Sequence, residues 1–172
     1  MVTGVQTCAL PIYYIGQKHL VGQGAVLRKM IDAGRVPSFI LWGPPGVGKT
    51  TLAQIIANKL DAPFYTLSAI SSGVKDVREV IEKAKSNCFF NTVSPILFID
   101  EIHRFSKSQQ DSLLNAVETG VVTLIGATTE NPSFEVIRPL LSRCQVYVLK
   151  SLDKNDLLTL LHKAIAEDVV LK

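Results

Sequence analysis

The 172-residue sequence has only three cysteines, Cys8, Cys88 and Cys144, and their spacing matches neither a metal site nor a disulfide framework. A small fold held together by disulfides is therefore excluded, and a reducing compartment is expected. No apolar run approaches the roughly 20 residues that a membrane-spanning helix needs. No positively charged segment precedes the apolar start of the chain, as it would in a signal peptide. We therefore expect a cytoplasmic protein with no membrane partner.

The sequence also lacks runs of lysine and arginine, internal repeats and low-complexity segments. A net charge of +3 permits contact with nucleic acid but does not argue for it. Hydrophobic residues make up 47% of the chain and charged residues 19%, which is typical of a globular domain and excludes a disordered chain. The length suits one packed domain, or one domain with the start of a second.

Short apolar runs rich in β-branched residues alternate with longer helical patterns. The runs have few polar interruptions, which is typical of strands buried on both faces. Alternation at this spacing indicates right-handed βαβ units, and hence an α/β fold with a parallel sheet between helices. The predicted strands are 38–43, 64–68, 95–100, 121–128 and 145–149, and the predicted helices are 24–34, 49–60, 74–87, 106–119 and 134–141.

The pattern changes after Leu149. Asp153 is suited to cap a helix, and leucine or isoleucine then recurs every four residues up to Ile165. This predicts a nucleotide-binding core over 13–150 and the truncated start of a helical unit over 151–172.

The segment GPPGVGKTT, residues 43–51, has the spacing G-x-x-x-x-G-K-[ST] between a predicted strand and a predicted helix. Glycines let the backbone fold around a phosphate chain, and the helix directs its positive end at the same anion. Lys49 is expected to reach the β- and γ-phosphates, and Thr50 to bind Mg²⁺. This context favours a phosphate site over a glycine turn with an incidental lysine. The expected nucleotide-binding residues are Gly43, Pro44, Pro45, Gly46, Val47, Gly48, Lys49, Thr50 and Thr51.

Two adjacent carboxylates, Asp100 and Glu101, end the buried strand PILFID. Ligands of open α/β sheets bind at this edge, so Asp100 is expected to hold Mg²⁺. Glu101 is expected to activate the water that attacks the γ-phosphate. Alone, such a pair of acids usually begins a solvated loop, but the phosphate loop upstream favours a catalytic role. A carboxylate that activates water also favours hydrolysis of the nucleotide over transfer of its phosphate.

A further buried strand ends in the polar residues 128–131 before Pro132. A hydroxyl there is suited to orient the attacking water, although turn-forming residues before a proline are as well explained by structure alone. Arg143 stands just before the last strand. It is either a surface ion-pair partner or an arginine finger that completes the site of a neighbouring subunit.

Several segments together resemble one family: YIGQKHLVG, ILWGPPGVGKTTLAQIIA, LSAISSGVKDVREVIEKAK, ILFIDEIHRFSKSQQDSLLNAVETG, TLIGATTENPSFEV and LLSRCQVYVL. They closely resemble the AAA+ ATPase core of the replication-associated recombination protein A family, whose eukaryotic relatives are the Werner helicase-interacting proteins. The resemblance runs from about Tyr14 to the end. It implies a P-loop NTPase fold with a five-stranded parallel sheet of order 5-1-4-3-2, ATP and Mg²⁺ as cofactors, and a helical lid beginning near the end of the chain.

The resemblance also implies roles that spacing does not assign. Ser68 resembles a switch position that restrains the catalytic glutamate until DNA binds. Thr129 resembles the sensor 1 residue, with Thr128 as the alternative, and Arg143 resembles the finger that acts on a neighbouring subunit. The segment expected to pack on adenine is Ile15, Gly16 and Gln17, with His19 nearby.

The expected function is ATP-driven DNA remodelling at stalled replication forks or junctions of single-stranded and duplex DNA. The resemblance implies DNA, a single-strand-binding protein and copies of the chain as partners, a tetrameric assembly and association with the nucleoid. A clamp-loader subunit and a Holliday-junction branch-migration motor are alternatives within the same class. A non-hydrolysing nucleotide-binding scaffold is the alternative from another class, but such proteins typically lose the lysine, the glutamate or the finger.

The first 12 residues differ from the rest, because the resemblance stops near Tyr14. The segment VTGVQTCALPI matches the translated reading frame of a common sequencing-library adapter. We therefore expect residues 1–12 to be non-native and without a role.

Overall fold

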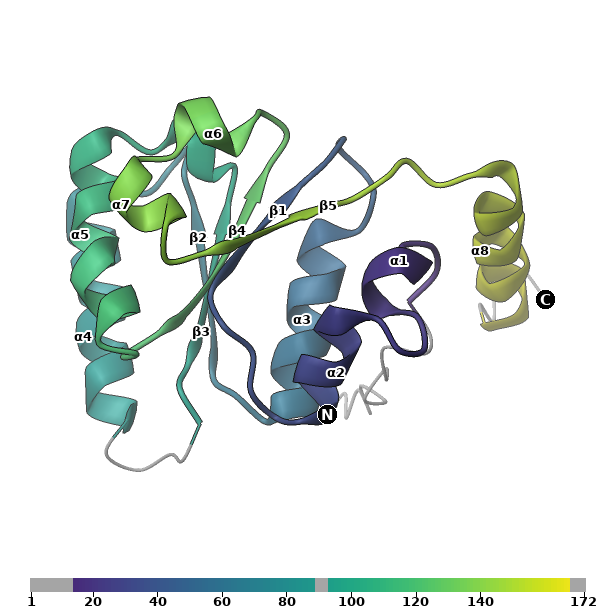
Figure 1. The fold of residues 1–172 in the computed structure, drawn as a ribbon, viewed down its shortest axis with the longest axis horizontal. Coiled ribbons are helices and arrows are strands. Elements are labelled where there is room, and N and C mark those ends of the chain that lie inside the picture. Colours follow the sequence, from purple (N-terminus) through teal and green to yellow (C-terminus); the bar gives the residue numbers. More distant parts are fainter. Residues whose placement is uncertain (1–13, 89–92, 168–172) are drawn as a thin grey trace, which may run out of the picture.

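The computed structural model describes residues 14–88 and 93–167 and shows a parallel sheet flanked by helices (Figure 1). The segment 1–12, expected to be non-native, lies outside the described residues. The strand order β2-β3-β4-β1-β5 is the predicted order 5-1-4-3-2 counted from the opposite edge, and each neighbouring pair is parallel. The strands are β1 (Phe39–Trp42), β2 (Phe64–Ser68), β3 (Ile96–Asp100), β4 (Thr123–Thr128) and β5 (Gln145–Val148).

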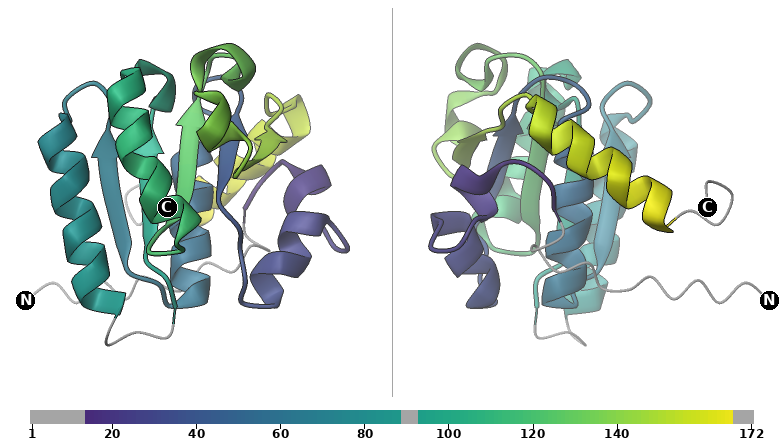
Figure 2. Two further views of the ribbon diagram at one scale, coloured as in Figure 1. Left: turned by 60° about the vertical axis from the view of Figure 1, so that its left-hand side comes forward. Right: turned by 90° about the vertical axis from the view of Figure 1, so that its right-hand side faces the viewer.

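Two layers of helices cover the two faces of the sheet (Figure 2). Side chains alternate along a strand, so Phe39 and Leu41 of β1 enter the core under the first layer and Ile40 enters the core under the second. The first layer is formed by α1 (Lys18–Val21), α2 (Val26–Asp32) and α3 (Lys49–Leu60), and the second by α4 (Val74–Cys88) and α5 (Lys107–Glu118).

The expectation that every strand is buried on both faces is wrong for β5. Its Val146 and Val148 side chains are 40% and 48% exposed, whereas β3 and β4 are buried along most of their length. The difference follows from position, because β5 is an edge strand that pairs only with β1. A short apolar run cannot by itself distinguish a central strand from an edge strand.

The predicted helix 134–141 is broken into α6 (Pro132–Glu135) and α7 (Arg138–Leu141). Pro139 has no N–H to donate to the carbonyl of Glu135, so a continuous helix would lose a hydrogen bond there. The buried Gln110 of α5 compensates for the break. Its amide donates to the Glu135 carbonyl at 3.1 Å and accepts from the Ile137 N–H at 2.9 Å.

The last described element, α8 (Lys154–Glu167), lies to one side of the sheet beyond an extended connection from β5 (Figure 1). The predicted helix is therefore present. Its apolar residues Leu157, Leu161 and Ile165 are each about half exposed. Within the described residues, no helix combines the length and apolar character needed to cross a membrane. The division between a core ending at 150 and a second unit beginning at 151 stays a prediction.

Candidate active site

The loop between β1 and α3 has the backbone that a phosphate site needs. Gly46 and Gly48 adopt left-handed φ values of 75° and 90°, and Gly48 is the N-cap of α3. A Cβ at Gly43 would lie 2.7 Å from the carbonyl oxygen of Leu149, so the close approach of the segment after β5 requires glycine there. The loop therefore leads directly into the positive end of a 12-residue helix.

Lys49, the first residue of α3, points back into this loop. Its ammonium group donates to the carbonyl oxygens of Gly43 and Pro44, each at 2.7 Å, and the residue is only 8% exposed. Burial lowers the pKa of Lys49, and the nearby carboxylates of Glu101 and Asp100 offset part of that decrease. The two acids predicted from the sequence thus face the predicted lysine.

One pocket of about 380 Å³ brings the predicted phosphate-binding and acidic residues together. It is lined by Pro45, Gly46, Gly48, Lys49, Thr50, Thr51, Asp100 and Glu101. The sheet brings the phosphate loop and the two acids together, because β1 and β3 both pair with β4 and their carboxyl ends lie at the same edge.

The donor set of this pocket suits Mg²⁺. The hydroxyl of Thr50 and the carboxylate of Asp100 are hard oxygen ligands, and Mg²⁺ usually combines one or two such groups with water and substrate phosphates. Across residues 14–88 and 93–167, no group of three histidine, cysteine or acidic residues is placed to hold a metal ion. With only these two oxygen ligands, Thr50 and Asp100 suit a metal ion that also binds the phosphates of a nucleotide.

Glu101 follows β3 in an unusual backbone conformation. Its φ of 53° lies in the left-handed region, which costs a non-glycine residue roughly 1–2 kcal/mol and is often found at functional sites. The turn begins the short helix η2 (Ile102–Arg104). The Glu101 carboxylate contacts two side chains: the Thr129 hydroxyl lies 3.4 Å from Oε2, and Nε2 of His103 lies 3.3 Å from the same oxygen.

The structure separates the two candidate sensor residues. Thr129, the first candidate, contacts the Glu101 carboxylate, and its sensor role stays a prediction. Thr128 is fully buried, and its hydroxyl contacts the backbone of Glu130 and the His103 ring instead. Ser68, the predicted switch, pairs with Asp100 across the sheet, but the described residues show no hydrogen bond between its side chain and Glu101.

His103 is the residue that our sequence analysis missed. In a strand or an ordinary loop, a residue three positions after Asp100 would not be expected to lie beside Glu101. The histidine becomes informative only when the chain after Asp100 turns as a 3-10 helix, which brings residue 103 back beside Glu101. The hydrogen bond from Arg104 N–H to the Glu101 carbonyl, at 2.8 Å, closes this turn.

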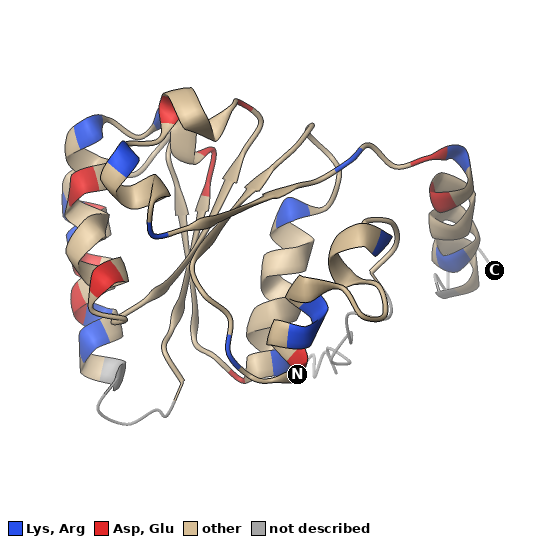
Figure 3. Ribbon diagram, in the orientation of Figure 1, with Lys and Arg blue, Asp and Glu red and all other residues tan. Residues whose placement is uncertain are grey.

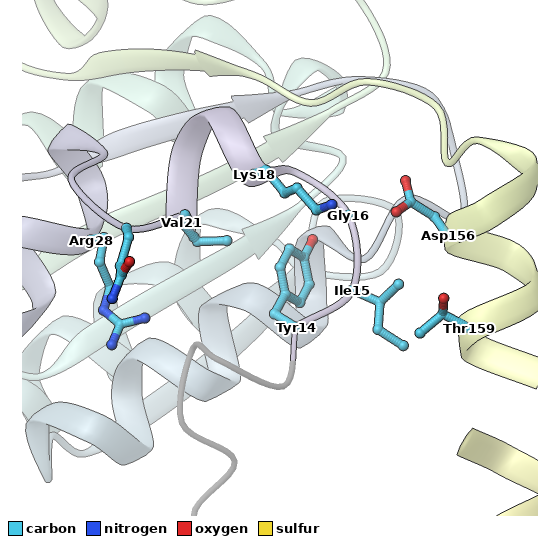
Figure 4. Close-up of a pocket in the computed structure, with 10 residues that line it drawn as sticks. Tyr14, Ile15, Gly16, Lys18, Val21, Arg28, Asp156 and Thr159 are labelled. Carbon is cyan, nitrogen blue, oxygen red and sulfur yellow. The ribbon is translucent and has the colours of Figure 1, made fainter. Parts of the chain in front are cut away.

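The predicted adenine segment lies between the phosphate loop and α8. Figure 4 shows the Ile15 side chain pointing toward Thr159 of α8, and Tyr14, Ile15, Gly16, Asp156 and Thr159 all line a pocket of about 390 Å³. A second pocket, of about 460 Å³, joins Tyr14 and Ile15 to the phosphate loop and to Leu152. The Tyr14 hydroxyl lies 3.0 Å from the carbonyl oxygens of both Val47 and Gly48, and burial raises its pKa to about 12.

Gln17 has a different environment from Ile15 and Gly16, because it lines neither pocket. Gln17 is buried, and its backbone has a left-handed conformation with φ 52°. Its side-chain amide makes two hydrogen bonds to the backbone of Lys150, at 2.6 and 2.9 Å. His19 likewise approaches the carbonyl of Val148, at 2.9 Å. These contacts fasten the N-terminal segment to the connection that leads to α8.

Arg143 lies away from the pocket of its own chain. It precedes β5 at the amino edge of the sheet, and the four residues of that strand, roughly 13 Å, separate it from the carboxyl edge. Its guanidinium group forms an ion pair with Glu118 and donates to the Pro139 carbonyl at 2.6 Å. Both interpretations from the sequence are compatible with this position: Arg143 has a surface ion-pair partner, and it does not line its own phosphate pocket.

Comparisons with known proteins identify the family of the chain. The model of the ATPase family associated with various cellular activities (AAA) matches residues 39–152. The chain is 53% identical over 154 residues to replication-associated recombination protein A of Haemophilus influenzae, covering 90% of this chain and 34% of that protein. It is 52% identical over 152 residues to ATPase WRNIP1 of Dictyostelium discoideum, covering 88% of this chain and 17% of that protein.

Among solved structures, the Thermotoga maritima RuvB Holliday junction branch migration motor has a TM-score of 0.72 and 30% identity, covering 89% of this chain and 51% of that one. The chain spans about a third of the length of the replication-associated recombination proteins that it matches. The matched family region contains the phosphate loop, the acidic strand end, Thr129 and Arg143. The chain therefore belongs to the AAA family of ATPases and is similar, within it, to replication-associated recombination protein A and WRNIP1.

Proposed function

We propose that the protein binds ATP with Mg²⁺ and hydrolyses it to remodel DNA during replication-fork maintenance, recombination and repair. The observation that carries this proposal is the single pocket shared by Lys49, Thr50, Asp100 and Glu101. Lys49 and the loop N–H groups bind the phosphates, while Thr50 and Asp100 hold the Mg²⁺, which stabilises charge on the phosphates when bound. Glu101 accepts a proton from the attacking water, and Thr129 orients that carboxylate.

DNA as the substrate is supported by the names of the relatives, and the placement of basic residues is compatible with it. Lys75, Arg78, Arg104 and Lys107 are all exposed. The Gln109 amide donates to the Ser72 carbonyl at 2.8 Å, so the start of α5 lies beside the loop before α4 and the two basic pairs share one region. Acidic residues also lie on α4 and α5 (Figure 3), so this surface is mixed rather than uniformly basic.

The partners and location belong to the same proposal. A single-strand-binding protein, further copies of the chain in a homotetramer, and a cytoplasmic, nucleoid-associated location follow from the resemblance. Arg143 supports assembly, because a finger at the amino edge of the sheet has to act on the nucleotide of a neighbouring copy. Similarity to RuvB favours Holliday-junction branch migration as the second candidate function.

The test is phosphate release from ATP by the full-length protein, with and without forked DNA. We expect DNA to stimulate release, and we expect Lys49→Ala to abolish both release and ATP binding because the phosphates lose their principal cation. A four-way junction in place of the fork tests the second candidate. Binding of ATP by the wild-type protein without any release of phosphate would instead support the scaffold alternative.

A further inference from the structure

His103 is placed beside the catalytic carboxylate by the packing of η2 on β4. Ile102, in the same turn, is fully buried, and a Cβ on Gly126 of β4 would lie 3.1 Å from its Cδ1 atom. The glycine therefore lets Ile102 pack directly on the strand. This close packing fixes the turn and brings the His103 ring against the end of β4.

The ring then contacts two groups at once. Its Nδ1 lies 2.9 Å from the Thr128 hydroxyl oxygen, and its Nε2 lies 3.3 Å from Glu101 Oε2. The Thr128 oxygen already accepts the Glu130 N–H at 3.0 Å, so its own proton is free to be donated, and Nδ1 is a closer acceptor than the Glu130 carbonyl at 3.2 Å. When the Thr128 hydroxyl donates to Nδ1, the N–H on Nε2 is directed toward Glu101.

The contacts on Glu101 are one-sided. Thr129 and His103 both approach Oε2, whereas Oε1 has no hydrogen-bond partner among the residues that the structure describes. The His103 side chain is only 12% exposed, so its position is defined by packing. A carboxylate can orient a water molecule when the protein holds one of its oxygens and leaves the other open to the water.

We propose that His103 is a positioning residue for ATP hydrolysis, which holds Oε2 of Glu101 against the end of β4 so that Oε1 faces the attacking water. This inference rests on the proposed role of Glu101 as the group that activates water. It adds a connection from the carboxylate to Thr128 and the end of β4, the strand that also carries Thr129 toward the site.

The test uses two substitutions of similar polarity in the full-length protein. Glutamine reaches the position of Nε2 and keeps a donor for Glu101, whereas asparagine reaches only the position of Nδ1 and keeps the contact with Thr128. We expect His103→Asn to lower kcat about 10- to 100-fold with KM for ATP unchanged, because a small misplacement of a catalytic group has effects of this size. His103→Gln should retain most of the wild-type kcat.

His162→Asn, at an exposed histidine of α8, is the matched control and should keep the wild-type kcat. Equal thermal stability of the two His103 variants excludes a difference in folding. Wild-type kcat in His103→Asn, or equal losses in the asparagine and glutamine variants, would overturn the role of His103. The same assay tests the proposed function separately, through hydrolysis by the wild-type protein and its loss in Glu101→Gln. A failure of the His103 role can therefore be distinguished from a failure of the proposed function.

Discussion

Tyr14 joins the N-terminal segment to the phosphate loop through a single hydroxyl group. The loop carbonyls of Val47 and Gly48 lie 3.0 Å from that group, and a Cβ on Gly48 would lie only 2.8 Å from it. A side chain at position 48 would therefore displace Tyr14, in addition to the backbone strain at φ 90°. At the scale of single residues, the loop is held by its neighbours as well as by its glycines.

Tyr14 also makes a prediction about pH. Burial raises its pKa from 10.0 to about 12, so the folded state favours the neutral phenol more than the unfolded state does. Its contribution to the free energy of unfolding is full below pH 10 and is lost as the pH rises through about 12. We expect denaturant unfolding to show a steeper loss of stability over this range in the wild-type protein than in Tyr14→Phe. Identical pH dependence of the two proteins would contradict the burial of this hydroxyl.

At the scale of elements, α8 is coupled to the N-terminal segment at Gly16 and Gln17. A Cβ on Gly16 would lie 2.5 Å from Leu152 Cδ2 and 3.5 Å from Asp156 Oδ2, and Gln17 bonds to the backbone of Lys150. The segment that lines the predicted adenine pocket is thus also the segment on which the approach to α8 rests. Any movement of α8 should change the shape of that pocket.

Gly16→Ala tests this coupling, and Gly24→Ala is its matched control. The two glycines have nearly the same φ, 82° and 81°, so alanine costs both roughly 1–2 kcal/mol of backbone strain. Only Gly16 has a neighbour within 4 Å of the added atom. We expect Gly16→Ala to weaken the binding of a fluorescent ATP analogue while Gly24→Ala leaves its Kd near that of the wild type. Equal Kd values in the two variants would show that the contact with Leu152 does not matter.

The elements that carry the site could be predicted from the sequence because their signals are local. The phosphate loop has a fixed spacing, and β3 is an apolar run that ends in two acids. His103 could not be found in this way, because its role depends on a left-handed residue at Glu101 and on a glycine of β4 distant in sequence. The break between α6 and α7 has a local signal in Pro139, but the buried Gln110 that satisfies the freed backbone groups belongs to α5 and is distant in sequence.

At the scale of the whole molecule, the phosphate pocket and Arg143 lie at opposite edges of the sheet. The phosphate loop, Glu101 and Thr129 lie at the carboxyl edge, whereas Arg143 lies before β5 at the amino edge and pairs with Glu118. Under the finger role proposed for Arg143, a second copy of the chain brings this arginine to each nucleotide. The ion pair with Glu118 then has to be exchanged for contact with a phosphate, a small cost because both partners are more than a third exposed.

Glu101→Gln in the full-length protein is the most direct test of the central claim that this pocket hydrolyses ATP. The amide keeps the size of the side chain but cannot accept a proton from water, so chemistry should stop while binding persists. We predict an ATP affinity close to that of the wild type, with phosphate release in the presence of DNA reduced at least about 100-fold. Phosphate release by Glu101→Gln at the wild-type rate would contradict the account.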